Sequence, residues 1–174
     1  ALNVNTGSAN TAVGSCSLTV NVGGANNTAV GTSSLAANTT GADNTAVGKN
    51  ALKANISGGC NIAIGNGSLF TNTTGICNSA VGLDALFFNT TGDNNVAFGS
   101  LALCKNTTAD NNTSVGFKSL RANTTGTSNT AMGCGALTTN TTASNNTAVG
   151  SSALLANTTG VSNVAVGFES LKTN

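Results

Sequence analysis

The chain has 174 residues and a formal net charge of +1, with 22 Gly and no Pro, Trp, Tyr or His. Only 6% of its residues are charged, against about 25% in a typical soluble protein. The six basic residues are scattered, which argues against a nucleic-acid partner, and no apolar run approaches the roughly 20 residues of a membrane span, which argues against membrane insertion.

A unit of 17 residues, Gly-x-x-Asn-Thr-Ala-Val-Gly-x-x-Ala-Leu-x-x-Asn-Thr-Thr, recurs ten times from Gly7 to Asn174 without an insertion or deletion. Such a strict repeat is typical of solenoids, in which each unit buries a small apolar face against the next. We therefore expect residues 7–174 to form one array and residues 1–6 to end a preceding partial coil. We also expect the chain to be a segment of a longer array whose targeting signal, caps and anchor lie elsewhere.

The Thr-Ala-Val stretch, at positions 5 to 7 when Gly7 is position 1, alternates as a strand does. Position 7 is never polar, so we expect it to face the core. Position 6 is Ala in nine copies and Ser114 in the tenth, which predicts a close contact on the opposite face, such as another subunit. The position-7 residues are Val13, Val30, Val47, Ile64, Val81, Phe98, Val115, Met132, Val149 and Val166.

Position 8 is always Gly, which ends this strand, and position 12 is always Leu. We expect a second short strand or extended corner to carry the Leu inward, opposite the Val. Two strands and two turns per unit predict an all-β parallel β-solenoid, or β-roll, of ten coils spaced about 4.8 Å apart and about 48 Å long in total. The position-12 residues are Leu18, Leu35, Leu52, Leu69, Leu86, Leu103, Leu120, Leu137, Leu154 and Leu171.

Position 4 is Asn in every copy, and stacked amides at this position would hydrogen-bond along the array and satisfy turn backbone. We interpret this column as a structural Asn ladder. Its members are Asn10, Asn27, Asn44, Asn61, Asn78, Asn95, Asn112, Asn129, Asn146 and Asn163.

Position 15 is also Asn, and here the following residues are usually Thr-Thr, which creates Asn-x-Ser/Thr sequons. One hypothesis is a file of N-glycans along a secreted fibre. The favoured alternative is a second turn ladder, because stacked turns prefer Asn and Thr in any case. The in-phase candidates are Asn38, Asn55, Asn72, Asn89, Asn106, Asn123, Asn140 and Asn157, and the off-phase sequons begin at Asn26, Asn66, Asn111 and Asn145.

The chain has too few acid, base and nucleophilic side chains for catalysis, so we expect no enzyme activity and no cofactor or metal. Asp93 and Asp110 share position 2 of adjacent units and are expected to lie on a solvated turn. Cys60 and Cys77 share position 3 of adjacent units, which predicts either a disulfide in an oxidising compartment or two free thiols.

The unit resembles the repeat of bacterial and phage tail-fibre-like surface proteins and, more loosely, the head repeat of trimeric autotransporter adhesins, which has a shorter period. The resemblance implies a left-handed β-roll assembled as a parallel trimer outside the cell or on a virion. It would place Val13 and its equivalents in the core of each protomer, and Ala12 and its equivalents at or near the subunit contact.

We therefore expect a structural segment of an extracellular, cell-surface or virion fibre, whose partners are copies of itself in a lateral trimer or an end-to-end filament. An alternative is an adhesin head that binds cell-surface glycan or protein, with Phe117 and Phe168 as candidate contacts. A third hypothesis is an ice-binding β-solenoid, because Thr recurs at constant spacing.

Overall fold

Each coil contains one short strand, formed where Thr, Val and Ile, which favour extended backbone, flank the small residue at position 6. The computed structural model describes residues 4–173. We number each coil by its strand and keep the position numbers of the 17-residue unit. The strands are β1 (Thr11–Val13), β2 (Thr28–Val30), β3 (Thr45–Val47), β4 (Ile62–Ile64), β5 (Ser79–Val81), β6 (Val96–Phe98), β7 (Thr113–Val115), β8 (Thr130–Met132), β9 (Thr147–Val149) and β10 (Val164–Val166).

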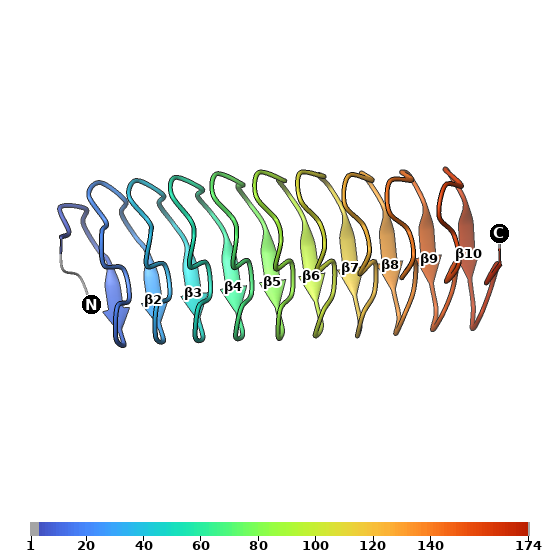
Figure 1. The fold of residues 1–174 in the computed structure, drawn as a ribbon, viewed down its shortest axis with the longest axis horizontal. Helices are drawn as coiled ribbons and strands as arrows, with labels where there is room; N and C mark the ends of the chain where they lie inside the picture. The colour runs from blue at the N-terminus through green and yellow to red at the C-terminus, as the bar shows by residue number, and fades with distance from the viewer. Residues whose placement is uncertain (1–3, 174) are drawn as a thin grey trace.

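The strands form a single parallel sheet in the order of the sequence, β1 to β10. Each strand pairs with the next at a register of 17 residues, so that Thr28 lies beside Thr45 and Ala29 beside Ala46. Figure 1 shows the result as a rod of stacked coils, with the described ends of the chain at opposite ends of the rod. The predicted parallel β-solenoid is confirmed. No helix of the described residues could cross a membrane.

The core is narrower than the sequence pattern suggested, and the strand turns the opposite face toward it from the one expected. Ala at position 6 is inside, since Ala29, Ala46 and Ala63 are all 0% exposed. Position 7 points outward instead, and Val13, at 57% exposed, shows that the core prediction for this column is wrong. The same correction applies to Val30, Val47, Ile64, Val81, Phe98, Val115, Met132, Val149 and Val166, which are all half-buried or exposed.

The close contact opposite position 6 is the protein's own position 11, on the far wall of the coil. Coil 7 shows this directly, because its position 6 is Ser114, whose Oγ donates a hydrogen bond to the Ser119 carbonyl at 2.8 Å. Position 11 is also fully buried, as at Ala51 and Ala85. Ala at position 6 is therefore small because a wall of the same coil faces it, and the expectation that it lies at a subunit contact is wrong.

The prediction that Leu at position 12 points inward is confirmed for coils 1 to 9, where this side chain is 0% exposed. In coil 10, Leu171 is 47% exposed. The expected second strand is not formed in the described coils. Each of these leucines instead lies in a turn with a positive φ, between 47° and 54°, which swings the side chain into the centre of the coil.

Gly at position 8 is required by both backbone conformation and space. Gly48 has a φ of 132°, which L-residues rarely adopt. A Cβ atom at Gly48 would lie only 2.6 Å from the carbonyl oxygen of Gly65 in the next coil. This glycine therefore allows the coils to stack at strand spacing where the chain leaves the sheet.

Candidate functional site: an outward Thr/Val face

The side chains at positions 5 and 7 point outward from the ten-stranded sheet, and we call this surface the Thr/Val face. Position 7 supplies Val, Ile, Phe and Met, of which Phe98 is 44% and Met132 43% exposed. No residue in either column is charged. The position-5 residues are Thr11, Thr28, Thr45, Ile62, Ser79, Val96, Thr113, Thr130, Thr147 and Val164.

Sequence reasoning missed this face because it assigned the larger apolar residues to the interior. The sequence feature that could have revealed this face is the invariably small residue at position 6, because a small residue is also expected where the opposite wall of the same coil is close. Beside the face, at position 9, lie the two candidate contact residues Phe117 and Phe168, both exposed, at 48% and 77%. They belong to coils 7 and 10 and do not form a continuous patch.

The position-4 Asn ladder is confirmed, and it connects side chains to backbone. The Oδ1 atom of Asn44 accepts a hydrogen bond from the backbone N of Asn61 at 3.0 Å. Its Nδ2 atom donates to the carbonyl of Gly58 at 2.9 Å. The side chain is fully buried. In coils 1 to 8 each such Asn therefore satisfies two backbone groups of the next coil that the narrow interior hides from water.

Position 15 forms a second buried ladder, which connects side chains directly to each other. The Nδ2 atom of Asn89 donates to Oδ1 of Asn72 at 2.8 Å and to the carbonyl of Gly92 at 2.9 Å. Both of its N–H groups are thus used, and the side chain is 0% exposed.

The folded solenoid has no room for a sugar at these buried amides, so the N-glycan hypothesis is wrong for the in-phase sequons and the alternative of a turn ladder holds. The amides concerned are Asn38, Asn55, Asn72, Asn89, Asn106, Asn123, Asn140 and Asn157.

The Thr-Thr pairs that suggested an ice-binding row divide into two files. Position 16 is mainly structural: Thr90 is half-buried, and its hydroxyl donates to the carbonyl of Thr107 at 3.0 Å. Position 17 is exposed, as at Thr74 and Thr91. Only one of the two Thr files therefore offers free hydroxyl groups.

Cys60 and Cys77 lie on adjacent coils as exposed free thiols. Desolvation, followed by the neighbouring Cys77 and the Asp43 carboxylate, raises the pKa of the Cys60 thiol. A disulfide between Cys60 and Cys77 stays a prediction.

The stacked carboxylates of Asp93 and Asp110 have a structural role, because Oδ1 of Asp110 accepts a hydrogen bond from the backbone N of Asp93 at 2.7 Å. Among residues 4–173, no group of three or more His, Cys, Asp or Glu could hold a metal ion.

A shallow groove of about 400 Å³ departs from the regular repeat on the side of coils 4 to 7. Position 14 is Phe88 and Lys105 here, whereas most other coils have Ala or Thr. Beside it, at position 13, the rings of Phe70 and Phe87 stack with centroids 4.8 Å apart. The groove is lined by Thr71, Phe88, Thr90, Lys105, Thr107 and Thr124.

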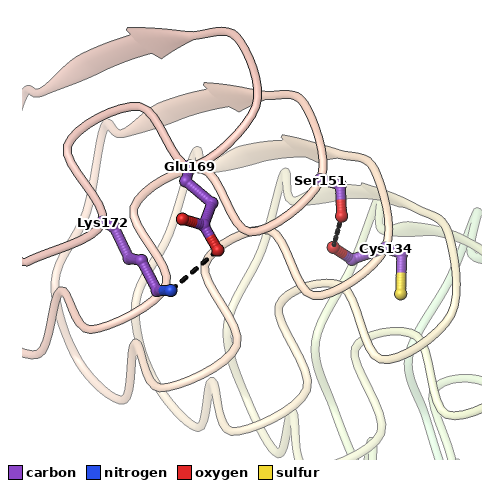
Figure 2. Close-up of polar contacts among 4 residues, drawn as sticks. All are labelled: Cys134, Ser151, Glu169 and Lys172. Carbon is purple, nitrogen blue, oxygen red and sulfur yellow. Dashed lines mark hydrogen bonds and ion pairs between the residues drawn. The ribbon is translucent and has the colours of Figure 1, made fainter.

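The single ion pair within the described residues joins Lys172 Nζ to Glu169 Oε1 at 2.7 Å in coil 10 (Figure 2). The same figure shows Ser151 Oγ donating to the carbonyl of Cys134 at 3.3 Å between adjacent coils. Both contacts are exposed, so they add little to stability.

No family model, curated protein or solved structure matches this chain.

Proposed function

We propose that this chain is a structural rod, a segment of an extracellular fibre or stalk that separates or displays other parts of an assembly. The observation that carries the proposal is the uninterrupted in-register pairing of all ten strands. Each coil repeats the same backbone pairing, the same two Asn ladders and the same Leu, so length grows coil by coil without a new fold.

The buried ladders also support a mechanical role. Bending the rod or sliding its coils would break the contact of Asn61 N with Asn44 Oδ1 and that of Asn89 Nδ2 with Asn72 Oδ1. Unsatisfied buried amides are costly, so every coil resists displacement from its neighbours. The resemblance of the unit to tail-fibre-like surface repeats points in the same direction.

Immunogold labelling of intact cells or virions from the natural source tests the proposal. We expect label on the outer surface, at a distance from the cell or virion body that decreases when whole 17-residue units are deleted from the gene. Label confined to the cell interior, or a distance that does not change with the number of units, would overturn the proposal.

A second candidate function, an adhesin that binds glycan or protein, is favoured by the groove beside Phe88 and Lys105. Its aromatic ring and cationic rim differ from the regular repeat, and a sugar ring could stack on the exposed face of Phe88. Binding of the purified protein to a glycan and cell panel, lost in Phe88→Ala, would support this candidate. A pure rod should bind nothing on the panel.

A further inference from the structure

The Thr/Val face is an uncharged, partly apolar surface that nothing covers on the described coils. Its two columns run along all ten strands; their bulkiest members, such as Ile64, Phe98 and Met132, are more than 40% exposed, and valines such as Val81 and Val115 are half-buried. Because the ten strands are spaced about 4.8 Å apart, the face is a strip about 43 Å long. Extended apolar surfaces of this kind usually mark an interaction site.

From coil 3 to coil 9, the side chains on this face alternate in size along the rod. Coils 4, 6 and 8 carry the bulky pairs Ile62 with Ile64, Val96 with Phe98, and Thr130 with Met132. Coils 3, 5, 7 and 9 carry only Thr or Ser at position 5 and Val at position 7. The face therefore has ridges on three even-numbered coils and shallower rows on the odd-numbered coils beside them.

We propose that this face binds a second copy of the chain, face to face, with the two rods antiparallel. A two-fold axis along the strand direction, between coils 5 and 6, brings coil 6 opposite coil 5, coil 8 opposite coil 3, and coil 4 opposite coil 7. Every ridge then faces a shallow row, and each column faces its own equivalent in the other copy.

At position 7 this symmetry pairs large side chains with small ones. Phe98 faces Val81 of the other copy, Met132 faces Val47, and Ile64 faces Val115. Alternation of large and small residues across facing layers is what allows them to interdigitate at protein density. A closed parallel pair would instead bring each coil opposite the same coil, so that ridges meet ridges and gaps remain at the shallow rows.

Area and charge are consistent with a second copy as the occupant. With the two columns and their side chains about 12 Å wide, the strip projects to about 500 Å² per partner, so that the pair would bury about 1,000 Å², the lower limit of a specific interface. Because neither column is charged, two identical faces do not repel each other. The variation in side-chain size fits a protein partner better than a uniform lattice such as ice.

Val47 and Met132 provide a sharp test, because they are five coils apart. Within one chain they are separated by about 24 Å, beyond the ~8 Å over which exposed charges interact in physiological salt. In the proposed dimer, Val47 of each copy faces Met132 of the other copy, so this pair occurs twice. We expect the full-length protein to be a dimer in sedimentation analysis, and we expect Val47→Lys and Met132→Glu each to weaken dimerisation at least about a hundredfold, because each buries an unpaired charge.

The double variant carrying Val47→Lys and Met132→Glu should recover the dimer, because each new lysine then faces a new glutamate. Ile56→Lys and Val22→Glu are matched controls, since both residues are exposed apolar side chains at position 16, away from this face, and they should leave dimerisation unchanged. Circular dichroism checks that each variant keeps the solenoid.

A monomeric wild-type chain, a dimer unaffected by the single substitutions, or single variants that the double variant does not rescue would each overturn the inference. A monomer that shapes ice crystals would assign the face to ice instead. This inference deepens the proposed rod function by naming a lateral partner. Small-angle scattering distinguishes failure of this inference from failure of the proposed rod function, because an elongated monomer would contradict the dimer and would still be a rod.

Discussion

At the level of single residues, the leucine at position 12 combines a large buried side chain with a left-handed backbone. Leu86 has a φ of 54°, and its equivalents in the other coils have similar values. This conformation costs a non-glycine residue about 1–2 kcal/mol. Burying a leucine side chain contributes about 1.5–3 kcal/mol. The fold therefore accepts a strained turn in every coil because the turn is what brings the one large apolar side chain into the centre.

The reversed faces of the strand predict opposite outcomes for neighbouring residues. Ala80→Val adds two methyl groups to a closed core and should destabilise the protein by about 1–3 kcal/mol, although Val favours strands. Val81→Ala removes an outward side chain and should change stability by less than about 1 kcal/mol. Chemical denaturation at a concentration where the chain is monomeric measures both. A larger loss of stability for Val81→Ala than for Ala80→Val would show that position 7 lies in the core.

Cys104 should react with alkylating reagents only at high pH. It is 8% exposed, and burial followed by the Asp84 carboxylate raises the pKa of its thiol, although Arg121 and Lys105 act in the opposite direction. The thiolate is the reactive form, so in a variant whose other four cysteines are Ser, the alkylation rate should rise at a higher pH than for an unfolded peptide thiol, whose pKa is about 8.5.

The same shift has a defined effect on stability. Because the folded-state pKa of Cys104 is the higher one, its contribution is complete below the unfolded thiol pKa and is lost as the pH rises through the folded one. Alkylation with the pH dependence of a free thiol would show that Cys104 is not buried in solution.

At the level of the structural element, the Asn ladders replace the second strand that the repeat seemed to require. The strand of each coil is only three residues long. Much of the remaining backbone pairs directly between coils, as at Leu86 N with the carbonyl of Ala102, and the ladders complete the pairing at the turns. This explains why Asn is retained at both positions while the neighbouring turn residues vary.

Asn89→Ala tests the second ladder. It leaves Oδ1 of Asn72 and the carbonyl of Gly92 with their contacts to Nδ2 removed, and it should destabilise the protein by about 1–3 kcal/mol. Asn66→Ala is the control, because Asn66 is exposed and should tolerate the change within about 0.5 kcal/mol. Equal effects of the two substitutions in thermal or chemical unfolding would contradict the ladder.

At the level of the whole molecule, the stacking predicts tolerance to changes in length by whole units. Deleting residues 24–40 removes one complete coil and should leave the circular dichroism per residue unchanged, because coil 1 can pair with coil 3 through identical Thr-Ala-Val strands. Small-angle scattering should show a rod shorter by about 5 Å.

Deleting only residues 24–32 provides the contrast, because it places strand residues beside turn residues and breaks both ladders at that point. We expect this variant to lose structure or to aggregate. Similar stability of the two deletion variants would show that the coils do not depend on a common register.

The sequence by itself determined the solenoid, its 17-residue register and the position-4 ladder, because an invariant period lets identical residues stack whatever the shape of the coil. It also placed Leu inward, since this is the one large apolar residue that never varies. Only the tertiary structure decided which face of the strand is inside. That choice depends on the distance between opposite walls of one coil, which admits Ala or Ser on each wall but no Val. The same narrow interior encloses the Asn of each Asn-Thr-Thr sequon, and it leaves the Thr/Val face as the surface available to a partner.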